Sequence, residues 1–123
     1  MRGCFWNSDG FGNRGKHLFV QETIKEYKLY FIAIIKIGRS SFSAPFLTSL
    51  AEGGDFEWHC LPPQGRSGSI LVGINMATLK VKNVFNGDRC IKFHLVSKLD
   101  GFEWAMIPFY GAAQDEQKHE FLA

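Results

Sequence analysis

The sequence predicts a mixed α/β (α+β) fold, in which a β-α-β-α beginning leads into antiparallel strands joined as hairpins. A nearly continuous apolar run, Tyr30–Ile37, follows an amphipathic segment and precedes a polar Gly-Arg-Ser-Ser loop. Such a run is typical of a strand that is buried on both faces. From Gly53 onward, apolar and polar residues alternate between turn signals, which is the pattern of antiparallel strands. We therefore expect one small domain over residues 1–123.

The first half of the chain is predicted to hold two strands and two helices. A short apolar run at Gly3–Asn7 indicates the first strand, and a Gly-rich loop separates it from a helix over Lys16–Lys28. Val20, Ile24 and Tyr27 recur at i, i+4 and i+7 in that helix, so they are expected on one buried face.

A second, short helix is predicted over Ser43–Ala51, where Pro45 falls in the first turn and is tolerated. The predicted strands that follow are Phe56–Leu61, Ser69–Asn75, Thr78–Phe85, Cys90–Val96 and Phe102–Tyr110. Asn86-Gly87-Asp88 is turn chemistry of the kind that joins hairpins. Gln114–Leu122 has the composition of a helix that begins close to the end of the sequence.

Composition excludes several classes of protein. A formal net charge of +2 is too small to predict nucleic-acid binding from bulk electrostatics. The three cysteines form no C-x-x-C pair, and this odd number without a signal peptide predicts a reduced, intracellular protein. No apolar run is long enough to cross a bilayer, so no membrane association is expected.

Three sequence patterns suggest ligands, and each has a simpler interpretation. Gly10–Gly15 matches the G-x-G-x-x-G dinucleotide fingerprint, but no acidic residue ends the Tyr30–Ile37 strand to hold a ribose, which favours a plain loop. Cys90 and His94 would lie roughly 13 Å apart along a strand, too far for one zinc ion. Lys80 and Lys82 are predicted to share a strand face, where they either contact phosphate or are simply solvated.

Several ordered segments together resemble a known family. Among them are W-N-S-D-G-F-G, G-R-S-S-F-S-A-P-F-L and L-P-P-Q-G-R-S-G. The segments are similar to ones in the endonuclease/exonuclease/phosphatase (DNase I-like) superfamily, and most of all to the amino-terminal endonuclease of plant LINE-type non-LTR retrotransposons. The similar segments lie at Trp6–Gly12, Phe19–Lys28, Gly38–Leu47, Leu61–Asn75, Gly87–Leu95, Asp100–Trp104 and Pro108–Gln114. The resemblance implies a partial four-layer α/β sandwich, with two sheets face to face and helices outside.

The resemblance also implies site residues. Asn7 matches the Asn of the family's first strand, which organises metal and phosphate, and Tyr110 matches a Tyr that contacts the scissile phosphate. Lys36 occupies the position of the family's metal-binding Glu, and Ser69 replaces a Gly. As an unpaired charge in a strand that is expected to be buried, Lys36 is also expected to lower the stability of the fold. The family's later Asp-x-Asn and Ser-Asp-His motifs are not found in these 123 residues. By this resemblance, the 123 residues would correspond to roughly the first half of the domain.

These features predict a truncated, degenerate retrotransposon endonuclease without activity by itself. The parent family uses Mg²⁺ to cleave DNA; in this chain we expect no bound cofactor, only weak and unspecific DNA binding, and a nuclear location by resemblance alone. One alternative is a binding remnant for nucleic acid or protein without chemistry, and another is a nuclease completed by a second chain. Because the opposing sheet would be largely missing, an uncovered sheet face and a poorly soluble, self-associating or molten species are also expected.

Overall fold

The computed structural model describes residues 1–38, 42–52, 54–61, 69–87 and 89–109. The elements in chain order are β1 (Gly3–Asn7), α1 (Arg14–Tyr27), β2 (Phe31–Ile35), α2 (Ala44–Ala51), β3 (Phe56–Leu61), β4 (Ile70–Asn75), β5 (Leu79–Asn86), β6 (Ile91–Ser97) and β7 (Glu103–Met106). The predicted β-α-β-α beginning and the hairpins that follow it are confirmed. The helix predicted over Gln114–Leu122 lies outside the described residues.

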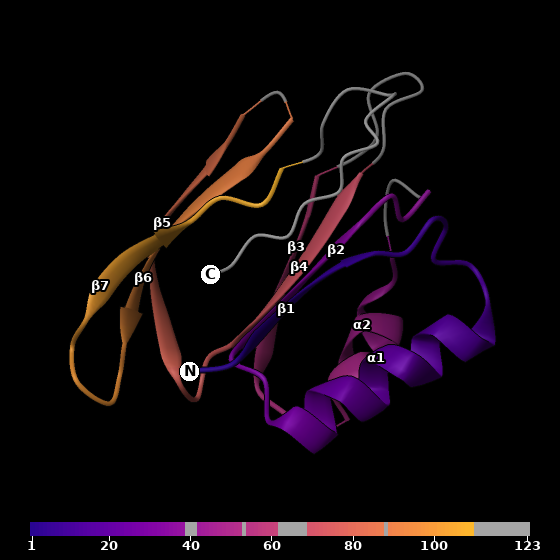
Figure 1. The fold of residues 1–123 in the computed structure, drawn as a ribbon, viewed down its shortest axis with the longest axis horizontal. Coiled ribbons are helices and arrows are strands. Elements are labelled where there is room, and N and C mark those ends of the chain that lie inside the picture. The colour runs from indigo at the N-terminus through magenta and orange to yellow at the C-terminus, as the bar shows by residue number, and fades with distance from the viewer. Residues whose placement is uncertain (39–41, 53, 62–68, 88, 110–123) are drawn as a thin grey trace.

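The strands form two sheets. A four-stranded sheet has the order β1-β2-β4-β3, in which β1 and β2 are parallel and the other pairs antiparallel; β5-β6-β7 is an antiparallel sheet. In Figure 1 both helices cover the outer side of the four-stranded sheet, and the three-stranded sheet lies across its other side. The order of layers is therefore helices, four-stranded sheet, three-stranded sheet.

The apolar run at the centre of the fold is buried on both faces, as predicted. Phe31 and Ala33 of β2 face the three-stranded sheet, and Ile32 and Ile34 face the helices. The strand is shorter than the predicted Tyr30–Ile37, however, because it spans only Phe31–Ile35. Lys36 and Ile37 therefore lie in the loop that follows the strand.

Lys36 corrects an expectation about buried charge. It follows β2 with a left-handed φ of 59°, and its side chain is exposed instead of lying within the buried strand. Its backbone N–H donates to the Ser69 carbonyl oxygen over 2.8 Å, so the chain turns out of the sheet at this residue. An exposed ammonium avoids the desolvation cost that the sequence suggested, and that part of the prediction is wrong.

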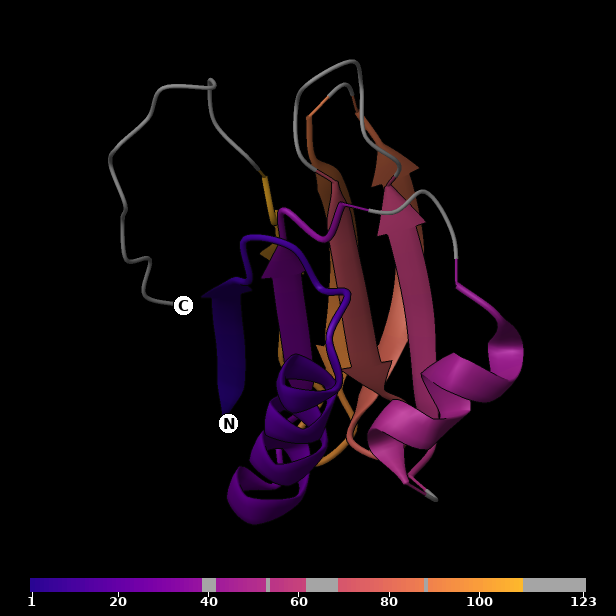
Figure 2. The same ribbon diagram turned by 90° about the vertical axis from the view of Figure 1, so that its right-hand side faces the viewer.

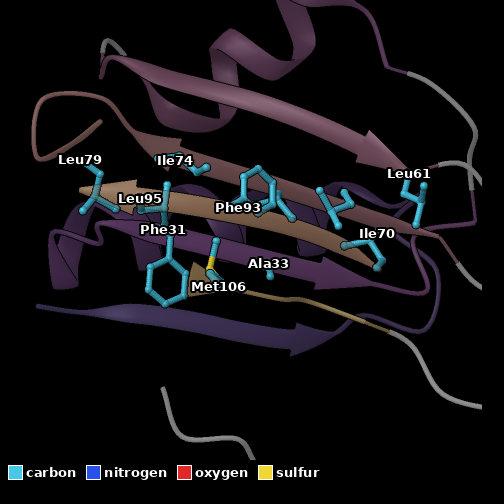
Figure 3. Packing of buried hydrophobic residues seen from close by; sticks show 11 residues of the cluster. Phe31, Ala33, Leu61, Ile70, Ile74, Leu79, Phe93, Leu95 and Met106 are labelled. Carbon is cyan, nitrogen blue, oxygen red and sulfur yellow. The ribbon is translucent and has the colours of Figure 1, made fainter. Parts of the chain in front are cut away.

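The two sheets supply one another's cover, which corrects a second expectation. Figure 3 shows Phe93, Leu95 and Met106 of the three-stranded sheet against Phe31 and Ile74 of the four-stranded sheet. The cluster comprises Phe31, Ala33, Leu61, Ile70, Val72, Ile74, Leu79, Ile91, Phe93, Leu95 and Met106. The opposing sheet is thus present within this chain, because Ser69–Asn75 and Cys90–Val96 belong to different sheets.

The helices cover the other side of β2. Asn13 and Ser43 cap α1 and α2, because their side chains accept hydrogen bonds from the backbone N–H of the third residue of each helix, as capping residues do. Val20 and Ile24 of α1 are buried as predicted, but Tyr27 is 50% exposed. Tyr27 is the last residue of α1, and the periodicity alone did not indicate where the helix ends.

Gly73 marks a close approach inside the four-stranded sheet. A Cβ atom at this position would lie 2.5 Å from Cζ3 of Trp58, whose ring covers the glycine from the neighbouring strand β3. We expect Gly73→Ala to lower the free energy of unfolding by about 1–3 kcal/mol, because overpacking forces the ring aside. Gly12→Ala is the control, since a Cβ there meets nothing within 4 Å. Equal urea midpoints for the two variants would contradict this packing.

Candidate functional site

Two of the sequence-predicted site residues come together where the parallel strands end. Asn7, the last residue of β1, is in register with Ile35, and Lys36 follows directly. Figure 2 shows β1 and β2 pointing to the same end of the sheet. Both Asn7 and Lys36 are exposed, so their side chains are accessible to a ligand. This edge is where open α/β sheets place their ligands.

The loop after β1 fixes the backbone of this edge. Ser8 is buried, and its hydroxyl donates to the carbonyl oxygens of Ile35 and Lys36 over 3.1 and 3.2 Å. The backbone N–H of Gly10 also donates to the Lys36 carbonyl oxygen over 2.6 Å. The backbone of Lys36 is therefore held on both sides, through its N–H and its carbonyl, while its side chain extends into solvent.

Lys16 holds the same loop from the other side. Its ammonium donates to the carbonyl oxygens of Ser8 and Gly10 over 2.7 and 2.8 Å, with Asp9 at 3.4 Å. The Gly10 N–H already donates to the Lys36 carbonyl oxygen, and the three loop carbonyl oxygens converge on the Lys16 ammonium. A phosphate cradle needs free N–H groups instead, so this geometry favours the plain-loop interpretation of Gly10–Gly15 over the dinucleotide fingerprint.

Sequence reasoning missed the roles of Lys16 and Ser8. A lysine in the first turn of a helix is unusual, because the positive end of the helix dipole favours acidic residues there. The position of Lys16 in the first turn of α1 is therefore the one sequence feature that could have indicated its role. Nothing in the sequence distinguishes Ser8 from an ordinary loop serine. Its role depends on contacts with residues 27 and 28 positions away.

Ser69 also lies at this edge. It is fully buried, and its hydroxyl has no hydrogen-bond partner among the described residues. Its carbonyl oxygen accepts from the Lys36 N–H. A buried hydroxyl without a partner carries a desolvation cost, which a glycine, expected here by resemblance, would not have.

Tyr110 lies outside the described residues, but the segment that leads to it is described. Phe109 forms an isolated antiparallel bridge with Cys90, and the Pro108 carbonyl oxygen accepts from the Ile91 N–H over 3.2 Å. In Figure 3, Phe93 lies nearer to Leu61 and Ile70 than Leu95 does, so β6 begins at that end of the sandwich. Because Ile70 pairs with Ile35, this is the end where Lys36 lies.

The donor set at this edge does not fit Mg²⁺. The ion prefers hard oxygen ligands in near-octahedral geometry, whereas Lys36, which follows the register partner of Asn7, brings a positive charge to this end of the sheet. Across the part of the chain that the structure describes, His, Cys, Asp and Glu side chains form no group of three that could hold a metal. Cys90 and His94 accordingly take part in no such group.

No protein-family model and no curated protein matches the chain. Among solved structures, it is similar to the AP endonuclease LMAP from Leishmania major, with a TM-score of 0.63 and 13% sequence identity. The similarity covers 88% of this chain and 39% of that protein. The fold is thus a partial α/β sandwich of the endonuclease/exonuclease/phosphatase type, and the chain spans about two fifths of its neighbour's length.

One further observation concerns membranes. Within the described ranges, neither helix is long and apolar enough to cross a bilayer.

Proposed function

We propose that this chain is part of a retrotransposon-type endonuclease domain, of the LINE non-LTR class, that has lost metal-dependent cleavage of DNA. The observation that carries the proposal is Lys36. Its backbone is hydrogen-bonded through both its N–H and its carbonyl, and it directly follows Ile35, the register partner of Asn7, where the sequence resemblance expects a metal-binding carboxylate. The nuclease-type fold supports the class, and the segments similar to plant LINE endonucleases support the origin.

The physical reason for the loss is electrostatic. Cleavage of this kind needs Mg²⁺ to stabilise the charge that develops on phosphorus and to help supply the nucleophile. An ammonium at the ligand position removes one hard oxygen donor and repels the dication. Asn7, at the end of β1, and Tyr110 match site residues only by resemblance, and neither could replace the missing ligand charge. We infer that the two residues are vestigial in this chain.

A plasmid-nicking assay tests the proposal. The purified chain, incubated with supercoiled plasmid and Mg²⁺, should give no more open-circular product than the same sample with EDTA. A Tyr110→Phe variant, purified in parallel, reports contaminating nuclease. Nicking that requires Mg²⁺, survives further purification and disappears in Tyr110→Phe would show a competent active site and overturn the proposal.

A further inference from the structure

β3 is an edge strand of the four-stranded sheet. It ends the strand order, at the opposite margin from β1 (Figure 2), and it pairs with β4 along one side. Just before β3 begins, the Met76 N–H donates to the Asp55 carbonyl oxygen over 2.7 Å. Because backbone groups alternate in direction along a strand, Glu57 and His59 direct theirs to β4, and Trp58 directs its own outward. Among the described residues, no group bonds to the Trp58 backbone on that outer side.

β3 lacks features that commonly protect a sheet edge. Natural edge strands carry lysines, prolines or bulges that prevent pairing with another chain. β5, which ends the other sheet, has a bulge that shifts its register between Val81 and Asn83, and it carries Lys80 and Lys82. Lys82 also forms an ion pair with Glu103 at 3.6 Å. β3 contains neither lysine nor proline, and its register with β4 is continuous over all six residues. β3 is therefore the edge better suited to accept another strand.

The side chains of β3 are complementary to a second copy of the same strand. His59 Nε2 donates to Glu57 Oε2 over 2.8 Å, and both side chains are partly exposed. In a two-fold antiparallel pair centred on Trp58, Glu57 of each copy lies directly opposite His59 of the other copy, and the two Trp58 backbones exchange hydrogen bonds. A pair centred on Glu57 or on His59 would instead place two like side chains opposite one another. The charges therefore select the register centred on Trp58.

Trp58 adds an aromatic contact on the other face of the strand. Its ring lies over Gly73 and stacks on Phe56, with 5.7 Å between the ring centroids. The ring is only partly buried, so at the two-fold axis it can meet the same ring of the second copy. Cross-strand aromatic pairs stabilise antiparallel sheets. The net charge of +2 gives little long-range repulsion between two copies.

We propose that the chain forms a two-fold dimer through β3, in which the two four-stranded sheets join into one continuous sheet. The self-association expected from the sequence would then use a sheet edge instead of a sheet face. An unrelated extended peptide fits the edge less well, because it does not supply the two reciprocal Glu57–His59 pairs. The dimer requires neither Mg²⁺ nor cleavage of DNA, so it stands apart from the proposed loss of activity.

Sedimentation equilibrium and NMR-detected hydrogen exchange of the full chain test the proposal. Dilution should convert dimer into monomer, and the Trp58 N–H should exchange more slowly in the dimer. Glu57→Lys should weaken the dimer at least about fivefold, because it changes two cross-strand pairs at once. Glu26→Lys makes the same change of charge at an exposed position of α1. This control should dimerise like the unmodified chain.

A mixture of two variants tests the register. Glu57→Lys alone places a lysine opposite His59, and His59→Glu alone places a glutamate opposite Glu57. The equimolar mixture restores two pairs of opposite charge, so it should form a heterodimer that neither variant matches by itself. Circular-dichroism melts show whether both variants fold. If His59→Glu does not fold, exchange of the Trp58 N–H in Glu57→Lys and Glu26→Lys decides the question.

Three outcomes would overturn the proposal. The first is a chain that stays monomeric at every concentration. The second is a Trp58 N–H that exchanges equally slowly at all dilutions, because another part of the same chain would then cover β3. The third is equal dimerisation of Glu57→Lys and Glu26→Lys, which would place the interface elsewhere.

Discussion

Phe93→Ala should lower the free energy of unfolding by about 3–5 kcal/mol, as large-to-small changes of buried aromatics do. The Phe93 side chain is fully buried between the two sheets, and its ring meets the His59 ring edge-on at 5.1 Å between centroids. Truncation leaves a cavity that two sheets facing one another cannot easily close. The loss would be a large part of the roughly 5–15 kcal/mol that stabilises a typical small domain.

Phe85→Ala is the matched control, because the two phenylalanines lie on the same hairpin but on opposite faces of its sheet. Phe85 is largely exposed, so its removal should change the free energy of unfolding by less than about 0.5 kcal/mol. Urea denaturation, monitored by circular dichroism, measures the free energy of unfolding of both variants. A non-cooperative transition of the unmodified chain, with strong binding of ANS, would instead support the loosely packed species that the sequence suggested.

The sequence predicted the order of elements well, because each depends on a local pattern. The apolar run of β2, the alternation along β5, and the spacing of Val20 and Ile24 in α1 are all readable over a few residues. Which sheet each strand joins depends on long-range pairing. The sequence therefore could not show that Ile70–Asn75 pairs with β2 while Ile91–Ser97 faces it, and the expectation of an inner sheet face without cover was wrong.

Sequence reasoning named the residues of the candidate site but did not predict their surroundings. Asn7 and Lys36 were identified by resemblance, and their adjacency follows from the parallel pairing of β1 with β2. The exposure of Lys36 was not predictable, because it depends on a left-handed residue held by Ser69 and Gly10. Lys82 and Glu103 likewise meet only because a bulge re-aims the lysine, and bulges leave no clear mark in a single sequence.

Lys36→Glu should give the chain a measurable affinity for Mg²⁺ without giving it nuclease activity. The substitution changes the local charge by two units. One unit charge about 4 Å from a dication contributes roughly 8 kcal/mol at an effective dielectric constant near 20. Solvent screens an exposed residue such as Lys36, so the observed gain will be far smaller. We expect at least a tenfold tighter apparent affinity, which corresponds to about 1.4 kcal/mol.

Nicking should stay absent because one carboxylate is only one ligand, and the described residues gather no further cluster of acidic groups around it. NMR chemical-shift titration with Mg²⁺ measures the affinity, with shifts expected at Asn7 and Ser8 beside the new carboxylate. Lys36→Met removes the positive charge without adding a ligand, so it separates the loss of repulsion from the gain of a ligand. Its affinity for Mg²⁺ should rise little.

If Lys36→Glu binds Mg²⁺ no better than Lys36→Met, the side chain does not point to a metal position, and the interpretation of Lys36 as a lost ligand fails. If Lys36→Glu nicks plasmid DNA, the rest of the catalytic machinery is intact and only this one substitution silences it.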